Sequence, residues 1–549
     1  MSLREFVEVL RRNGELAVVS APVDPYLEIA EIADRASKAG GPALLFERPV
    51  PAALAGSAPP PNAHRFTGPP MPVLMNQFGS TRRLELALGA PLDELAARIG
   101  DLVELQVPKG LVGKVKALGQ LRELASFAPK VVSKAAFREV AADPPDLGRL
   151  PVLTTWPRDG GAFVTLPVCV TKDREGRRNA GMYRLQVFDE RTTGMHWHVH
   201  HDGAANFRQA DGRLEVAVAL GTDPTVTYAA TAPLPPGIDE FMFAGFLRGR
   251  PVELAPCATV DLEVPADAEI VIEGLVDPEL LEPEGPFGES HGHVALEDFN
   301  MSMQVTAITR KRNAVFASIV SQVTPSESSV VKRVAYEPMF LAHLRDHLGV
   351  RGVRRVVLHE PLSNIRPIIF VQFAPAAPRT EVWRGLQAAA TLRADCGKIV
   401  IAVSDDVDPT NTDAVMWSLA YRCNPGEDLH VSPHRSGGHG PKSGRREEDA
   451  TLMIDATLKQ SLPPVALPER RFMERAREIW TELGLPPLKP QAPWHGYSLG
   501  DWDARWDVYA ERALAGTWAD SGIETFARRR GGLTPETPAR QVETPDKKG

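Results

Sequence analysis

The spacing of apolar residues changes near Leu150 and again near Ser326, and this change constrains the fold more than any single motif. From residue 150 to about 324, apolar and polar residues alternate in short runs, as in 164–168, 183–187 and 225–228. Alternation with a period of two is typical of half-buried strands, and Gly and Pro between short strands favour a barrel or sandwich. We therefore expect a central β-barrel or sandwich domain over residues 126–325.

The segment before this domain alternates helix and strand. Ser2 can cap a helix that ends at Gly14, strand-like residues 15–19 follow, and a helix at about 27–39 precedes an apolar run at 42–46. This order predicts a small N-terminal α/β domain over residues 1–125. Residues 109–138 mix Lys with Leu and Val at helical spacing, which favours a solvated amphipathic helix over a membrane-surface helix.

The segment after the central domain alternates helices with nearly all-apolar strands. A helix at about 330–348 is followed by strands at 367–371 and 398–403, with a helix near Glu381 between them. This alternation indicates a doubly wound α/β domain with a mostly parallel sheet, over residues 326–465. Helices near 470–483 and 504–514 follow (466–528), and we expect the charged, Pro- and Thr-rich tail at 529–549 to be disordered.

Composition limits the class of protein. A chain of 549 residues is too long for one core, so we expect an α/β multidomain protein. The net charge of −8, without a basic run, argues against nucleic acid as a partner. The four cysteines form no Cys-x-x-Cys pair, which favours a cytoplasmic protein over a disulfide framework. The sequence has no signal-peptide pattern and no membrane-spanning run, and peripheral membrane association stays open.

A short stretch in the central domain carries two carboxylates around a stiff turn: Glu284-Gly285-Pro286-Phe287-Gly288-Glu289. Two Gly and one Pro break regular structure, so we expect a loop that presents both glutamates. Two glutamates on a turn are most often simply solvated. Paired acids on a stiff loop also suit proton transfer, and the rest of the chain favours that interpretation.

A second stretch is rich in histidine, at residues 195–201. If residues 179–184 and 195–201 are strands of a hairpin, Met195 and Trp197 face the core and His196 and His200 share the other face, together with His198. Such a face is either a wet surface or a polar site, and its His-x-His spacing also suits zinc. Glu240 could instead join one His and one Asn around Mn²⁺ or Mg²⁺, with a phosphate to complete the shell.

Taken together, these motifs resemble the UbiD family of decarboxylases, which uses prenylated FMN. The chain contains, in one order, Asn179-x-x-x-Tyr183-Arg184, Met195-x-Trp197-x-x-His200, Glu240-x-x-x-Ala244-Gly245-x-Leu247-Arg248-Gly249 and the Glu284–Glu289 stretch. The resemblance runs from the N-terminal helix to about residue 515. It implies that the central domain is a cofactor-binding, flavin-reductase-like split β-barrel, and that the last helices mediate assembly into a homodimer or higher homo-oligomer.

The resemblance also implies roles for single residues. A Mn²⁺ (or Mg²⁺) that grips the cofactor phosphate is bound by Asn179, His200 and Glu240, with a K⁺ ion beside it. The catalytic set is Arg184, Glu284 and Glu289, and Arg184 also contacts the cofactor. Further cofactor contacts match Thr231, Pro233, Thr324 and Lys442. His196, His198 and His201 become pocket or surface residues, and Val199 stands where some members carry Gln.

The chemistry agrees with this resemblance. Loss of CO₂ from an aromatic or vinylic carbon needs an electron sink that no side chain supplies. Arg184 can hold a carboxylate in two-point geometry, and Glu289 is the expected proton donor, with Glu284 and Arg184 tuning it.

We therefore expect a reversible decarboxylase of an aromatic or α,β-unsaturated acid, with CO₂ as a product. Within the resemblance, the chain looks most like members assigned to quinone biosynthesis, which implies a hydroxylated naphthoate or hydroxybenzoate as the leading substrate. A flavin prenyltransferase would supply the cofactor. Cinnamate-like, dihydroxybenzoate and heteroaromatic acids stay open. The rival hypotheses are a zinc hydrolase built on the His cluster and a non-catalytic flavin-binding module.

Overall fold

The computed structural model describes most of the chain, and the fold below refers to these residues only: 1–51, 64, 66–92, 94–95, 125–197, 212–232, 234, 238–295, 298–438, 448–460, 462–463, 466, 468, 470–488, 505–529 and 538. Six residues singled out by the sequence lie outside this set, namely His198, Val199, His200, His201, Pro233 and Lys442. Most of the predicted helix at 109–138 and nearly all of the predicted tail also lie outside it.

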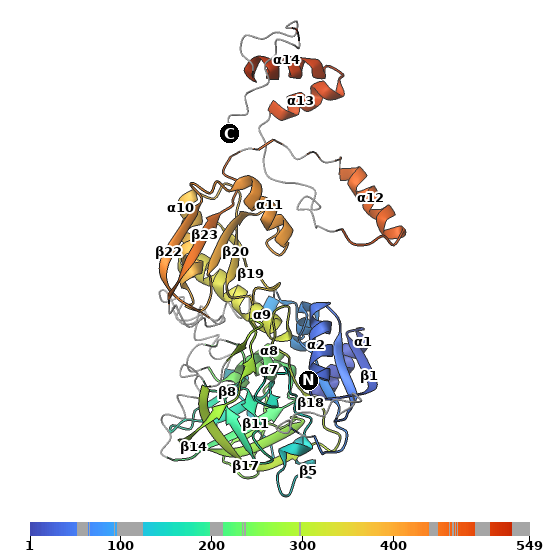
Figure 1. The fold of residues 1–549 in the computed structure, drawn as a ribbon, viewed down its shortest axis with the longest axis vertical. Helices are drawn as coiled ribbons and strands as arrows, with labels where there is room; N and C mark the ends of the chain where they lie inside the picture. Colours follow the sequence, from blue (N-terminus) through green and yellow to red (C-terminus); the bar gives the residue numbers. More distant parts are fainter. Residues whose placement is uncertain are drawn as a thin grey trace.

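The N-terminal segment forms the α/β unit that the sequence predicts (Figure 1). Ser2 and Glu5 form a capping box at the start of the first helix, and that helix buries Phe6 and Leu10 against the unit's core. The sheet order is β1-β2-β3-β18, and its last strand comes from much later in the chain. The elements are α1 (Leu3–Arg12), β1 (Leu16–Val23), α2 (Glu28–Lys38), β2 (Ala43–Pro49), β3 (Val73–Met75), α3 (Thr81–Leu88) and β18 (Phe316–Ala317).

The central segment is dominated by strands, as predicted. Its main sheet has the order β10-β17-β14-β11-β7-β8, with β5 also paired to β17. In the described residues this sheet is open and no barrel closes, so the split barrel stays a prediction. The strands are β4 (Lys130–Val131), β5 (Val140–Ala141), β6 (Phe163–Val164), β7 (Val168–Lys172), β8 (Arg178–Gly181), β9 (Leu185–Gln186), β10 (Thr192–Met195), β11 (Leu214–Leu220), β12 (Glu253–Pro256), β13 (Glu263–Pro265), β14 (Ile270–Glu284), β15 (Phe287–Gly288), β16 (Val294–Ala295) and β17 (Asp298–Arg310).

Two local predictions for this segment are wrong. Residues 225–228 are not a strand but part of the buried helix α7 (Pro224–Ala229), because Asp223 caps the helix and Pro224 occupies its first turn. The described end of the predicted helix at 109–138 is also not a continuous helix. Lys130 donates its backbone N–H to Val252 O at 2.8 Å, which places β4 in a small sheet beside β12.

The C-terminal segment forms a five-stranded sheet in the order β19-β20-β21-β23-β22. The middle strands β20, β21 and β23 are parallel and both edge strands are antiparallel, so the sheet is parallel only at its centre. Alternate residues of β20 pack on opposite faces, with Val371 in the core that includes α10 and Phe370 in the core that includes α11. The elements are α9 (Glu327–Ala342), β19 (Val353–Leu358), β20 (Ile368–Phe373), α10 (Arg379–Thr391), β21 (Ile399–Ser404), α11 (Thr412–Arg422), β22 (Leu429–Ser436) and β23 (Glu448–Asp455).

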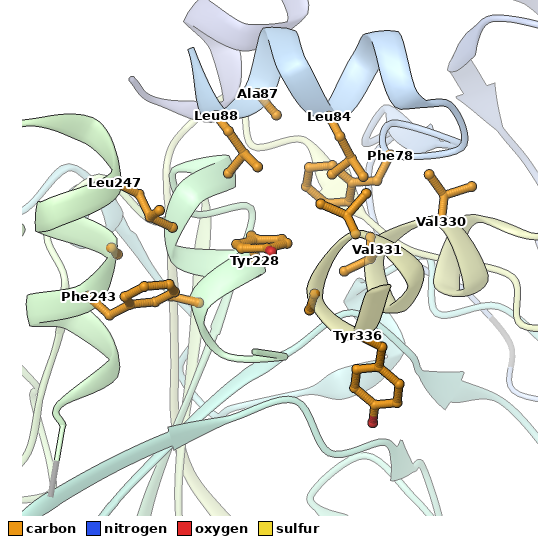
Figure 2. Close-up of a cluster of buried hydrophobic side chains, with 14 of the residues drawn as sticks. Phe78, Leu84, Ala87, Leu88, Tyr228, Phe243, Leu247, Val330, Val331 and Tyr336 are labelled. Atoms are coloured by element: carbon orange, nitrogen blue, oxygen red, sulfur yellow. The ribbon is translucent and has the colours of Figure 1, made fainter. Parts of the chain in front are cut away.

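The three segments share one hydrophobic core. Figure 2 shows Tyr228 of α7 between Leu247 of α8 (Glu240–Arg248) on one side and side chains of α3 and α9 on the other, among them Leu84 and Val331. Because these helices come from all three segments, their packing fixes the central sheet against the C-terminal segment. The residues of the candidate site are therefore carried on a continuous framework.

The last helices lie at the end of the molecule farthest from the central sheet (Figure 1). They are α12 (Arg470–Glu482), α13 (Arg505–Leu514) and α14 (Trp518–Arg529), the last of which the sequence did not predict. Phe472, Trp480 and Leu483 are 56%, 41% and 66% exposed. Within the described part of the chain, no helix is both long enough and apolar enough to cross a bilayer.

Candidate active site

The stretch from Glu284 to Glu289 is more regular than the sequence suggests. Glu284 is the last residue of β14, and Phe287 and Gly288 form the short strand β15, which pairs with β16. The prediction that the whole stretch is irregular is therefore wrong at its first residue and at Phe287–Gly288. The carboxylate of Glu284 is therefore positioned by the long strand β14 of the main sheet.

Close packing against a neighbouring backbone and a tryptophan ring explains the glycines of this stretch. A Cβ added to Gly285 would lie 2.5 Å from the Cα of Gly160, and a Cβ on Gly288 would lie 2.0 Å from Cδ1 of Trp156. Neither position can hold a side chain without displacing its neighbour. Gly160 also donates its backbone N–H to Pro286 O at 2.7 Å, so the stretch is tied to the segment beneath it.

Two side chains complete this attachment. The amide of Gln186 accepts from Gly285 N at 2.7 Å and donates to Gly160 O at 2.9 Å, which bridges the two segments. Asp159 accepts the backbone N–H of Gly288 at 2.9 Å. Burial raises the pKa of Asp159 to about 6, against the lowering effect of that hydrogen bond.

Arg184 lies between the two acids and contacts both. Its Nε and Nη2 donate to the two oxygens of Glu284 at 2.9 Å each, and its Nη1 donates to Glu289 Oε1 at 2.5 Å. The guanidinium also lies 4.4 Å from the ring centroid of Phe287. The structure therefore brings together the three side chains that the family resemblance grouped, although Arg184 lies about a hundred residues before the two acids in the chain.

The two acids differ in their surroundings. Glu284 is 2% exposed, and it accepts hydrogen bonds from Arg184, from His196 Nδ1 at 2.6 Å and from Asn300 Nδ2 at 3.2 Å. Burial alone would raise the pKa of Glu284, but the hydrogen bond from His196, then those from Arg184, lower it to about 2. Glu284 is therefore a carboxylate at any working pH, and its partners hold it in place.

The histidine-rich run begins as predicted, although the hairpin is wrong. Met195 and Trp197 are buried while His196 points to Glu284, so the expected alternation of faces holds for these residues. However, β8 pairs with β7 and β10 pairs with β17, because the wider sheet takes up both strands. Arg184 stays beside the run, since it accepts the backbone N–H of His196 at 3.1 Å.

Two of the predicted metal ligands lie side by side. Glu240 is the first residue of α8, and its Oε2 accepts the backbone N–H of Ala180 at 3.1 Å, next to Asn179. An ion pair of Arg178 with Asp239 at 3.1 Å holds the same strand against the same helix end. Among the described residues, the amide oxygen of Asn179 accepts no hydrogen bond.

This pair fits part of a cation site. An amide oxygen and a carboxylate are ligands for hard ions such as Mn²⁺ or Mg²⁺. His200, the third predicted ligand, lies outside the described residues. Within the part of the chain that the structure describes, no group of three His, Cys, Asp or Glu side chains is placed to hold a metal.

The other predicted cofactor contacts occupy different positions. Thr231 follows α7 and donates its hydroxyl to Tyr228 O at 2.7 Å, and the neighbouring Ala230 O accepts from Met182 N, close to β8. Thr324 is fully buried, its hydroxyl donates to Glu360 O, and the same hydroxyl accepts from Asn364 N at 3.0 Å. Cofactor contacts of Thr231 and Thr324 stay predictions.

The structure adds residues that the sequence did not single out. Lys332 of α9 is half-buried, and burial, then Arg366, lowers its pKa to about 8, while Glu289 acts in the opposite direction. Asn300 joins the hydrogen bonds on Glu284 from β17, and Asp159 supports Gly288. No local pattern marks these residues, because their partners come from distant parts of the chain.

Three family models match the chain. They are the N-terminal domain, the Rift-related domain and the C-terminal domain of 3-octaprenyl-4-hydroxybenzoate carboxy-lyase (UbiD), and they match residues 7–103, 130–323 and 331–456. The candidate acid–arginine site lies within the second of these matches.

Known proteins match over most of the length. An uncharacterized protein of Archaeoglobus fulgidus is 38% identical over 496 residues, which cover 88% of this chain and 98% of that protein. The structure of the UbiD-class enzyme HmfF from Pelotomaculum thermopropionicum in complex with FMN is 27% identical, with a TM-score of 0.73, and covers 87% of this chain and 100% of its own. An evolved dimeric form of HmfF in complex with prFMN is 28% identical, with a TM-score of 0.69, over 85% and 97% of the two chains.

Proposed function

The chain belongs to the UbiD family of carboxy-lyases, and we propose that it is a reversible, non-oxidative decarboxylase of an aromatic or α,β-unsaturated acid that uses prenylated FMN. The observation that carries this proposal is the position of Arg184 between Glu284 and Glu289. Such a set can bind a carboxylate and move a proton at one place, and these are the two operations that decarboxylation requires of the protein.

Arg184 is the carboxylate-binding group. A guanidinium has five N–H donors in a fixed plane, and the described contacts of Arg184 with the two glutamates use three of them. The remaining donors can bind a substrate carboxylate in two-point geometry. The contact with Phe287 holds the guanidinium plane, so the bound carboxylate has a fixed orientation.

Glu289 is the proton donor. Once CO₂ has left, the carbon that carried it needs a proton, and a carboxylic acid within reach can provide it. Glu284 is unsuited to this task because its hydrogen bonds keep it ionised. Prenylated FMN, when bound, supplies the electron sink that the side chains lack.

Asn179 and Glu240 fit a divalent cation that holds the cofactor phosphate, with His200 as the third ligand. The ion is Mn²⁺ or Mg²⁺, because the two oxygen ligands favour a hard cation, and a K⁺ ion beside it belongs to the same proposal. Thr231, Pro233, Thr324 and Lys442 are the further proposed cofactor contacts, on a central domain that we propose to be a split barrel.

The substrate that we favour is a hydroxylated naphthoate or hydroxybenzoate of quinone biosynthesis. The family description, which names an octaprenyl-hydroxybenzoate carboxy-lyase, supports this class. Other aromatic, heteroaromatic or cinnamate-like acids are the alternative. A flavin prenyltransferase is the proposed source of the cofactor, and a cytoplasmic homo-oligomer is the proposed state. Membership of a carboxy-lyase family leaves the zinc hydrolase without support.

The test combines cofactor identification with a substrate screen. The chain is produced together with a flavin prenyltransferase, and the small molecule released on denaturation is identified by mass spectrometry. The purified protein is then screened for CO₂ release from hydroxybenzoates, naphthoates and cinnamates. We expect a prenylated flavin, bound manganese or magnesium, and CO₂ release from at least one aromatic acid. Bound zinc without flavin, or bound flavin with turnover indifferent to Glu284→Gln and Glu289→Gln, would contradict the proposal.

A further inference from the structure

His196 contacts the acid–arginine site, although the resemblance assigns it no catalytic role. Its Nδ1 lies 2.6 Å from Glu284 Oε2, and its side chain is 14% exposed. Its backbone N–H donates to Arg184 O at 3.1 Å. The residue is therefore joined to Glu284 by its ring and to the Arg184 backbone by its main chain, which sets where the ring can lie.

The hydrogen bonds around Glu284 show which ring nitrogen carries the proton. Arg184 and Asn300 can only donate to Glu284 through their side-chain nitrogens, which they do at 2.9 Å and 3.2 Å. Because Glu284 is ionised it can only accept, so the 2.6 Å contact requires the ring nitrogen of His196 to donate, while Asn300 Nδ2 lies farther from that nitrogen, at 3.4 Å. The Nδ1 of His196 therefore carries a hydrogen in the neutral and in the charged ring alike.

We propose that His196 is a positioning residue that keeps Glu284 ionised and aligned as the anchor of Arg184, so that Glu289 alone exchanges a proton with the substrate. This inference rests on the proposed decarboxylase function. It goes beyond the set of Arg184, Glu284 and Glu289. It proposes that a fourth side chain keeps Glu284 ionised and so leaves proton exchange to Glu289.

Glu284 needs such a residue because its carboxylate is buried and because it shares Arg184 with Glu289. Glu284 is almost fully buried, which disfavours its charge, and its main cationic partner is shared with Glu289. A carboxylate that lost one of its three donors would bind a proton more readily and would compete with Glu289. Asn300 cannot replace His196, because its amide lies farther from the same oxygen, at 3.2 Å.

The charged and titratable groups around this site come from several elements. Arg184 precedes β9, His196 follows β10, and Glu289 lies across the guanidinium from Glu284. Glu289 acts to raise the pKa values of Lys332 of α9 and of His291, and Asp159 accepts a hydrogen bond from Gly288 N. Of these described groups, Arg184 and His196 alone are shown bonded to Glu284, so a change at His196 acts first on that carboxylate.

The test uses a matched pair of variants. His196→Asn places an amide donor near the position of Nδ1, whereas His196→Leu removes the donor at similar size. His430→Leu, at an exposed position of β22, is the control for loss of a histidine. For the cofactor-loaded enzyme we expect His196→Leu to lower kcat by about tenfold or more with little change in KM, and to move the acid limb of the pH profile to higher pH.

We expect His196→Asn to restore the wild-type pH profile. A His196→Leu variant with the wild-type kcat and pH profile, or a His196→Asn variant no better than His196→Leu, would overturn the proposal.

A second readout needs neither cofactor nor substrate. Infrared spectra of the cofactor-free protein are recorded from about pH 8 to about pH 4, with Glu284→Gln as the reference. After subtraction of the Glu284→Gln reference, which removes the bands of other carboxyls such as Asp159, we expect His196→Leu to show a protonated-carboxyl band of Glu284 that the wild type and His196→Asn do not show. Identical titrations of His196→Leu and wild type would overturn the proposal. If the wild type released no CO₂ from any acid, the function would fail while this titration would still decide the role of His196.

Discussion

The stretch at residues 284–289 differs from the helix α12 in how many contacts its side chains make within the chain. The two acids of the stretch contact Arg184 of the same chain, and the glycines Gly285 and Gly288 lie close against Gly160 and Trp156. In α12, no side chain is buried, and apolar residues such as Phe472 and Trp480 remain exposed. The difference teaches that side chains of one chain form the acid–arginine site, whereas α12 buries no side chain against the described part of the same chain.

The largest expected effect comes from removing the proton donor. Glu289→Gln should lower kcat by ~10²–10⁴-fold, the usual contribution of a positioned general acid, while the flavin still binds. CO₂ release and the absorbance of bound flavin measure the two properties separately. Glu279→Gln, at an exposed position of β14 away from the site, is the matched control. Near-normal turnover of the Glu289 variant would remove the proposed role.

Adding a single methyl group, by a Gly→Ala substitution, should destabilise the tightly packed stretch but not the exposed helix α14. In Gly288→Ala the new Cβ would meet Trp156 at 2.0 Å, whereas nothing lies within 4 Å of a Cβ on Gly522 of α14. We expect Gly288→Ala to lower the free energy of unfolding by about 3 kcal/mol, at the upper end of the usual cost of overpacking. Gly522→Ala should be neutral or stabilising by up to about 1 kcal/mol, because Ala favours the helix. Equal urea-unfolding curves for both variants would show that the stretch is not tightly packed.

The acid dependence of stability offers a finer test. The pKa of Glu284 lies at about 2 in the folded protein, below its ordinary value of 4.5. A lowered folded pKa gives stability that is present above the unfolded pKa and is lost as the pH falls through the folded pKa. The difference in unfolding free energy between wild type and Glu284→Gln should therefore shrink by about 2 kcal/mol between about pH 5 and about pH 3.

Urea unfolding at both pH values measures this difference, and Glu482→Gln on the exposed α12 is the matched control. A constant difference for Glu284→Gln would mean that Glu284 is not held ionised in the folded chain.

The smallest effect on activity is expected in α12. If a second copy of the chain covers this helix, Phe472→Glu should lower the molar mass in solution, measured by light scattering, and kcat per chain should stay within about twofold. Arg477→Glu, on the same helix, controls for the change in charge. An unchanged mass would show that the exposed apolar residues of α12 do not mediate assembly.

Local signals predicted much of the fold. The capping of the first helix, the alternation of the N-terminal elements and the two covered faces of the C-terminal sheet follow from short-range patterns. Residues 225–228 alternate apolar and polar side chains, which predicts a strand. They form a helix instead, because Asp223 caps its start and a proline occupies its first turn. The strand order of the open central sheet could not be predicted from the sequence, because it depends on which strands pair across long separations.

In the candidate site, too, some residues could be identified from the sequence and others only from the structure. The family resemblance groups Arg184, Glu284 and Glu289, and in the structure the three side chains are in contact. The sequence could not reveal Asn300, which reaches Glu284 because β14 and β17 pair Glu282 with Asn300 and place Asn300 diagonally beside Glu284. Lys332 was missed for a related reason, because its effect on Glu289 arises only once α9 has docked.

The strand β18 has a consequence for any attempt to cut or recombine this chain. Phe316 donates its backbone N–H to Pro72 O at 2.8 Å, and Ser318 donates to Leu74 O at 3.1 Å, so a piece of the central segment forms the rim of the N-terminal sheet. A fragment that stopped before the central segment would leave β3 with an open edge prone to self-association. Chimeras between relatives must therefore exchange residues 316–318 together with the first sheet, even though 243 positions separate the paired residues Val73 and Phe316.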